Sequence, residues 1–228
     1  MANNDYEATG ILALDHVTPV INALFSAFKL NETHPGNGQA YIARISESND
    51  PRWRDVLDGL EMLASQLGVP MPDDEGLSIP TLLELLAAHF GADGNVELEN
   101  LIEHHSFEDM ADLDALFLIA SCFDDGHHLT TIEFEGCWRC SKPLLFEFGG
   151  DACYLSREVR VIDTSTQALQ LGGQLRKAVL TADLEEASAL VALEITNLLA
   201  GVSDEQFRLN LRRRVAERLA QAPAISAT

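Results

Sequence analysis

The sequence predicts an α+β fold: an N-terminal β-α-β-α unit, a helical middle, a three-stranded antiparallel meander and a helical C-terminus. Three observations predict it. Apolar residues alternate with period two in several short segments, they recur at helical spacing in longer ones, and turn residues separate the segments. We expect residues 1–163 to form an acidic α+β domain and residues 164–228 to form a helical region.

Residues 1–68 carry the β-α-β-α unit. Residues 6–14 and 39–46 alternate as strands, Pro19 lies in the first turn of the helix after the first strand, and residues 31–38 read as a loop. Because a helix joins the two strands, their simplest pairing is parallel, through that crossover.

Helices fill the middle of the chain, residues 77–126, and its C-terminus. The first of them opens at Ser78 and ends at Gly91, which are typical start and stop signals. The expected helices are residues 78–91, 96–105 and 109–123 in the middle, and 165–182, 184–200 and 204–221 after the meander.

The clearest β pattern lies in residues 127–163. Thr130, Ile132 and Phe134 fall on one face of a strand, and the alternation repeats twice further along the chain. The expected strands are residues 128–136, 144–148 and 153–161, and the expected turns are residues 137–143 and 149–151.

The close pair Cys137 and Cys140 suggests a metal site, because CxxC spacing suits tetrahedral zinc. A closed site needs four ligands, and His127, His128 and Cys153 are candidates. In the meander, however, these three lie at the opposite end of the strands, roughly 16 Å away at about 3.3 Å per residue. We therefore expect no cofactor, and no single site that joins Cys137, Cys140 and Cys153. The alternative is a zinc-dependent or thiol-dependent enzyme, or a zinc-stabilised adaptor, centred on the pair.

Two polar clusters are further candidates for chemistry. On a helix, His104 and His105 would each share a face with the carboxylate four residues on, as metal ligands or as a solvated helix end. Residues 124–128, Asp-Asp-Gly-His-His, form a turn that, with Cys122 and Cys153, could hold a metal or a Cys-His nucleophile pair. The chain has no phosphate-binding glycine loop and no GxSxG motif, which argues against a nucleotide-dependent enzyme.

Charge is distributed unevenly along the chain. Residues 1–150 hold 26 Asp/Glu against 6 Lys/Arg, whereas residues 151–228 hold 10 against 9. The first part has no basic cluster, so direct nucleic-acid binding is not expected. No apolar run reaches 18 residues and no signal-peptide pattern is present, so we expect no membrane partner and a cytoplasmic protein.

This charge predicts an acidic, non-enzymatic module that binds a protein with a basic surface, for example one that handles nucleic acid. The expected partner-binding residues are the densest acidic clusters: Asp73, Asp74, Glu75, Glu97, Glu99, Glu108, Asp109, Asp112, Asp114, Asp124 and Asp125. In composition, and in no motif, the chain resembles the acidic, lysine-poor antirestriction and anti-CRISPR proteins of phages and plasmids. That resemblance implies an inhibitor or nucleic-acid mimic of anti-defence type. Solubility alone is the other role that such charge serves.

The helix that starts at Leu184 is apolar around more of its circumference than a surface helix needs. This predicts a homodimer through the C-terminal helices, with Leu190, Val191, Ile195 and Leu198 in the interface. Packing against neighbouring helices of the same chain is the alternative.

Overall fold

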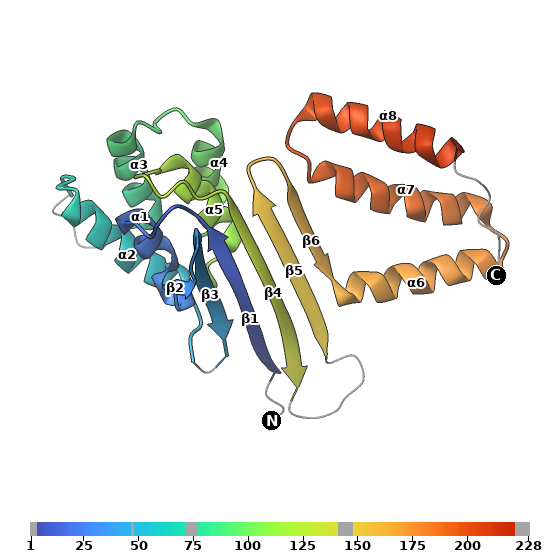
Figure 1. The fold of residues 1–228 in the computed structure, drawn as a ribbon, viewed down its shortest axis with the longest axis horizontal. Coiled ribbons are helices and arrows are strands. Elements are labelled where there is room, and N and C mark those ends of the chain that lie inside the picture. Colours follow the sequence, from blue (N-terminus) through green and yellow to red (C-terminus); the bar gives the residue numbers. More distant parts are fainter. Residues whose placement is uncertain (1–3, 47, 72–76, 141–147, 222–228) are drawn as a thin grey trace. The chain divides into compact units, whose positions relative to one another are not determined.

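The computed structural model describes residues 4–46, 48–71, 77–140 and 148–221. The predicted mixture of helices and antiparallel strands is confirmed, and the first five strands lie in one sheet in the order β2-β3-β1-β4-β5 (Figure 1). The chain divides into two compact units, residues 1–155 (unit 1) and residues 156–228 (unit 2), which are described in turn.

Unit 1 contains five α-helices and five strands among its described residues. Its elements are β1 (Asn4–Ala13), α1 (Pro19–Phe25), β2 (Asn31–Pro35), β3 (Gln39–Ile45), α2 (Trp53–Gln66), α3 (Ile79–Phe90), α4 (Val96–His104), α5 (Leu113–Cys122), β4 (Thr131–Cys140) and β5 (Gly149–Ser156), at whose end the unit stops.

The helix boundaries follow local capping chemistry. Thr18 Oγ1 accepts the N–H of Ile21 at the start of α1, and Ser78 caps α3, which ends at a left-handed Gly91, as predicted. Helix α5 starts at Leu113 rather than at the expected Asp109. Asp109 has a φ of 58°, which a right-handed helix excludes, so the helix begins only after its N-cap residue, Asp112.

The expectation that the first two predicted strands pair in parallel was wrong. Strands β1 and β3 are antiparallel, with Glu7 opposite Ile45 and Ala13 opposite Gln39. The reason is β2, which lies in the segment expected to be a loop. It is exposed at every position, so it shows no alternation, and it pairs antiparallel with β3. The helical crossover therefore leads from β1 to β2, and β3 turns back between them.

The predicted boundaries of the meander were also wrong. β4 continues through Cys140, where a turn was expected, because it pairs with β1 along its full length. The expected turn at residues 149–151 is the start of β5, and the alternation breaks at Arg157 because a turn there separates β5 from β6. The expected strand at residues 144–148 lies outside the described residues, except for Phe148.

One face of the unit 1 sheet is buried beneath helices α1 to α5. Leu12, Ile42 and Ile132 point to this face from three adjacent strands and are fully buried in one core with residues of all five helices. Each such side chain contributes roughly 1.5–3 kcal/mol by leaving water. Residues of the other strand parity, such as Glu7 and Glu133, are exposed on the opposite face.

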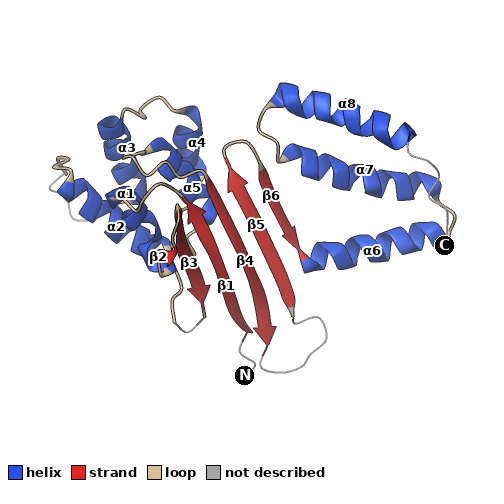
Figure 2. Ribbon diagram, in the orientation of Figure 1, coloured by secondary structure: helices blue, strands red, loops and turns tan. Residues whose placement is uncertain are grey.

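The described part of unit 2, up to residue 221, contains three helices and one strand (Figure 2). Its elements are β6 (Arg160–Thr164), α6 (Ser165–Leu180), α7 (Leu184–Ala200) and α8 (Glu205–Gln221). Thr164 caps α6 in a capping box with Gln167, as the predicted start at this position requires. The α7–α8 turn is held to the start of β6, since the N–H of Arg160 donates to the Gly201 carbonyl at 2.8 Å.

Candidate functional site

Five exposed carboxylates follow one another along α4 and the segment after it. Glu97, Glu99 and Glu103 lie on α4, and Glu108 and Asp109 follow. Leu98 is the buried residue of α4, so its carboxylates occupy the solvent side of the helix. We refer to these five residues as the α4 acidic segment; Glu97, Glu99, Glu108 and Asp109 were predicted contact residues, and Glu103 was not. The predicted cluster Asp73, Asp74 and Glu75 lies outside the described residues.

The four remaining carboxylates of the predicted set lie in α5 and the turns beside it. Asp112 Oδ1 accepts the N–H of Ala115 at 2.9 Å, which caps α5, and Asp125 Oδ2 accepts the N–H of Val20 at 3.1 Å, at the start of α1. Asp124 accepts backbone N–H groups of its own turn. Asp114 is half-buried in the first turn of α5. The structure thus separates an exposed group of predicted contact residues from a group that contributes to the fold.

Helix α4 ends at His104, so the i,i+4 faces considered for His104 with Glu108 and for His105 with Asp109 do not form, and His104 lies exposed at the end of the helix. The Nε2 atom of His105 lies 2.9 Å from Asp112 Oδ2 instead. Over the described ranges of the chain, no three His, Cys, Asp or Glu residues gather in a way that could hold a metal ion.

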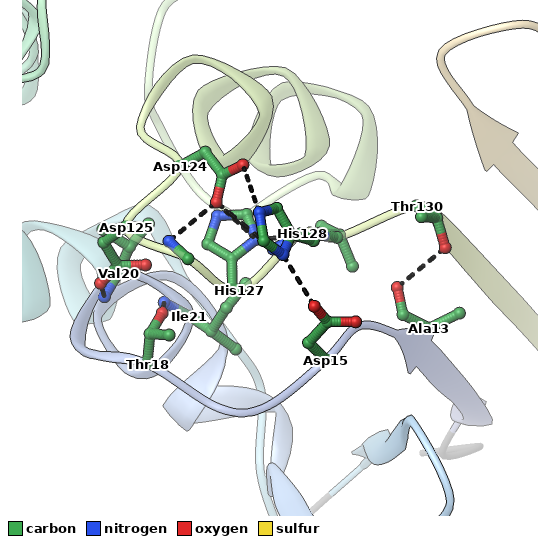
Figure 3. Close-up of polar contacts among 12 residues, drawn as sticks. Ala13, Asp15, Thr18, Val20, Ile21, Asp124, Asp125, His127, His128 and Thr130 are labelled. Carbon is green, nitrogen blue, oxygen red and sulfur yellow. Dashed lines mark hydrogen bonds and ion pairs between the residues drawn. The ribbon is translucent and has the colours of Figure 1, made fainter.

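Figure 3 shows a polar cluster where the β1–α1 loop meets the α5–β4 loop. His128 Nδ1 lies 2.7 Å from Asp15 Oδ2, and its Nε2 lies 3.9 Å from Asp124 Oδ2. The N–H of Asp15 also donates to the carbonyl of His127 at 2.8 Å. These contacts join residues 113 positions apart in the sequence, so the cluster connects two loops at one end of the sheet.

The pKa values of the two adjacent histidines are shifted in opposite directions. The hydrogen bond to Asp15, aided by the charge of Asp124, raises the pKa of the exposed His128. Burial lowers the pKa of His127, against the opposing charges of Asp124 and Asp125. His127 Nδ1 accepts the N–H of Leu129 at 2.8 Å, which leaves the neutral ring's proton on Nε2. That buried atom faces the Ala120 backbone without a hydrogen bond of standard geometry.

The pair His128 and Asp15 has the arrangement of an imidazole oriented by a carboxylate, which nucleophilic enzymes use. The hydroxyls drawn near it are engaged elsewhere: Thr18 caps α1, and Thr130 Oγ1 donates to the β1 backbone at 3.1 Å (Figure 3). Cys122 packs against the hydrophobic core. The contacts drawn in Figure 3 therefore connect loops.

The CxxC pair lies in the middle and at the end of β4. Residues three apart in a strand point to opposite faces, and accordingly Cys137 is exposed whereas Cys140 is buried. Cys153 lies in β5 and packs against the core. This arrangement does not favour a zinc site shared by the two cysteines, because their sulfur atoms do not converge.

A second group of carboxylates lies on the open face of the sheet. Glu133 and Glu135 on β4 are exposed, as is Glu7 on β1, which lies directly opposite Cys137. Arg139 reaches Glu7 at 3.7 Å. We refer to the three glutamates as the sheet-face carboxylates. Alternation of Glu133 and Glu135 with apolar residues is visible in the sequence, but Glu7 is far away in the chain, and only the pairing of β1 with β4 brings it to their face of the sheet.

Unit 1 has a groove of about 730 Å³ at the starts of α2 and α3. Trp53, Ile79 and Phe107 form its apolar part. Its charged lining is mixed and consists of Arg52, Arg54, Asp58, Glu61 and Asp109. Such a lining selects no sign of charge, and we assign no ligand to the groove.

Unit 2 leaves most of its apolar side chains in water. Among its described residues only Ala178 and Leu199 are buried hydrophobic residues. Of the predicted dimer residues, Val191 is 47% exposed and Leu198 is 61% exposed, while Leu190 and Ile195 are half-buried. Packing within the chain thus leaves much of α7 uncovered.

The comparisons with known proteins give no relative: no protein-family model matches the chain, and no curated protein and no solved structure matches it. A functional assignment therefore rests on the residues themselves. None of the described helices combines the length and the apolar character that crossing a membrane requires.

Proposed function

We propose that this chain is a non-enzymatic interaction protein that binds a basic surface of another protein through carboxylates of unit 1. The observation that supports it is the charge of that unit. Residues 1–155 hold 27 Asp/Glu against 6 Lys/Arg, a net of −21, whereas residues 156–228 hold 9 of each. The net charge of unit 1 remains −21 whichever of its own ion pairs form.

The α4 acidic segment is the contact surface that this proposal favours. Its side chains are exposed, five of them lie within 13 residues, and the fold does not use them for capping or for joining loops, as it uses Asp112 and Asp125. A field of this sign accelerates association with a basic partner and repels DNA and RNA. If the partner is a nucleic-acid-binding protein, carboxylates in its basic groove exclude the nucleic acid, which makes this chain an inhibitor.

The test starts from proteins captured from cell lysate by the full chain. Each captured protein is purified, and its affinity for this chain is measured at salt concentrations from about 0.1 M to about 1 M, over which the screening length falls from about 10 Å to about 3 Å. The proposal expects a steep loss of affinity across that range.

Two matched variants separate a specific surface from a general field. One is Glu97→Gln with Glu99→Gln and Glu108→Gln, in the α4 acidic segment, and the other is Glu7→Gln with Glu133→Gln and Glu135→Gln, among the sheet-face carboxylates. Each removes three charges. At about 0.5 kcal/mol per exposed charge pair, the first should lose about tenfold in affinity and the second far less. Affinity that is indifferent to salt and to both variants would mean that the charge serves solubility only.

A further inference from the structure

Helix α7 lacks the burial that holds an ordinary helix in place. Of its 17 residues only Leu199 is buried, and Leu184 is 81% exposed, Leu198 61% and Val191 47%. Helices in stable domains bury an apolar stripe against another element. These exposed side chains therefore mark a surface that something else covers.

The exposed side chains of α7 form a stripe suited to another helix. Leu184, Val191 and Leu198 are seven residues apart, so each successive one drifts by only about 20° around the helix. Ile195 lies beside the same line. Seven-residue spacing is the pattern by which apolar side chains pack between two helices.

Unit 1 offers no matching apolar face among its described residues. Its exposed large hydrophobic residues are scattered over several elements: Met62, Met71, Val96, Trp138, Phe148 and Tyr154. Unit 2, in contrast, exposes such residues on each of its three helices, including Leu180 on α6 and Phe207 on α8. The surface that best matches unit 2 in apolar character is therefore unit 2 of a second copy.

The charges of the helices indicate which helices pair between the two copies. Helix α7 holds Glu185, Glu186 and Glu194 and no Lys or Arg, whereas α8 holds five Arg and two Glu. Two copies related by a two-fold axis can place α7 of each against α8 of the other, which brings a net of −3 next to a net of +3 twice. Unit 2 as a whole is neutral, so its association meets none of the repulsion that unit 1 would cause.

We propose that unit 2 is a self-association module, in which α7 and α8 of one copy pack against α8 and α7 of a second copy across a two-fold axis. The occupant of the exposed α7 stripe is thus a second copy of this chain. This inference is independent of the partner proposed for unit 1, and it makes the protein a dimer with two acidic surfaces.

The first experiment measures the mass of the full chain by light scattering at micromolar concentration. We expect twice the 24.9 kDa of one chain. Val191→Glu combined with Leu198→Glu should give the monomer mass, while the control Ala189→Glu with Leu193→Glu, which adds the same charge to the other side of α7, should stay dimeric. All four positions are exposed, so circular dichroism should show unchanged helix content. A wild-type chain of monomer mass overturns the proposal, as does a dimer that survives Val191→Glu with Leu198→Glu.

The second experiment tests the pairing of α7 with α8 between copies. One variant carries Arg212→Glu and Arg213→Glu, so that both helices are acidic, and the other carries Glu186→Arg and Glu194→Arg, so that both are basic. Each alone should be monomeric, and the mixture should dimerise. A mixture that stays monomeric beside a dimeric wild type would overturn the α7–α8 arrangement.

Discussion

Unit 1 is highly charged and has a buried core, whereas unit 2 is neutral and buries few apolar side chains. Unit 1 carries a net charge of −21 and encloses a continuous core that includes fully buried Trp53, Phe25 and Leu60. Unit 2 is neutral and, over its described residues, buries only Ala178 and Leu199 among its hydrophobic side chains. The mean hydropathy of +0.01 for the whole chain averages two regions with different physical needs.

The difference shows that the two units face different energetic demands: unit 1 must be stable despite repulsion between its carboxylates, and unit 2 must be stable with little apolar burial. Burial of the core of unit 1 offsets the repulsion among its carboxylates. The exposed carboxylates produce a negative electrostatic potential around the unit. Unit 2 carries equal numbers of acidic and basic residues and, over its described residues, buries few apolar side chains; in the proposal above, its apolar helices supply an association surface. The two units thus divide partner recognition from self-association within the proposals made above.

The largest expected difference between the units comes from deleting an apolar side chain. Leu60→Ala, at a fully buried position of α2, should lower the free energy of unfolding by about 2–5 kcal/mol because it leaves a cavity. Leu180→Ala, at a position of α6 that is 67% exposed, should change it by less than about 0.5 kcal/mol. Urea unfolding followed by circular dichroism measures both. Equal losses would show that unit 2 buries Leu180 after all, and the contrast between the units would fail.

A smaller difference, with opposite signs, is expected from adding a methyl group to a helical glycine. In Gly59→Ala the new Cβ would clash with the carbonyl oxygen of Ala23, where α1 and α2 pack closely, so unit 1 should lose about 1–3 kcal/mol. In Gly172→Ala nothing lies within 4 Å of the new atom, so α6 should gain about 0.5–1 kcal/mol from helix propensity. Thermal unfolding of both variants would measure the two signs, and a stabilising Gly59→Ala would contradict the close packing of α1 on α2.

Acid should act on unit 1 through His127. Burial lowers its folded-state pKa below the ordinary 6.5, so protonation favours the unfolded chain. The stability that neutral His127 supports is complete above pH 6.5 and declines as the pH falls through the lowered pKa. His127→Asn, which keeps an acceptor for the Leu129 N–H, should therefore lose less stability than wild type between about pH 7.5 and about pH 5.

The neighbouring His128 provides a control, because its contribution to stability depends on pH in the opposite direction to that of His127. Its pKa is raised by Asp15, so its contribution is complete below pH 6.5 and is lost as the pH rises through the raised pKa. His128→Asn should make unit 1 more sensitive to acid than wild type. Urea unfolding across this pH range measures both variants, and identical pH profiles would remove the role assigned to the cluster.

The smallest expected effect is that of salt. Raising the salt concentration from about 0.1 M to about 1 M screens repulsion among the carboxylates of unit 1, so its backbone amides should exchange hydrogen more slowly. Amides of neutral unit 2 should change less. Hydrogen exchange of the full chain, resolved by peptide, measures the two units side by side, and a larger response in α6 to α8 would contradict the charge contrast.

Local chemistry let the sequence determine where most helices begin and end. Thr18, Ser78 and Gly91 act within one turn of their own position, so their effect does not depend on distant residues. The uneven charge and the surplus of apolar residues in α7 are likewise properties of composition and spacing, and the structure adds only their exposure.

The tertiary structure alone decided how the strands are paired and which polar residues meet. Strand β2 has no buried face and therefore no alternation, and β4 runs through the CxxC pair because β1 supplies hydrogen bonds along its whole length. Cys137 and Cys140 are separated by that extension, and His128 meets Asp15 across 113 residues. Strand pairing depends on partners far away in the chain, so no local pattern could have fixed these contacts.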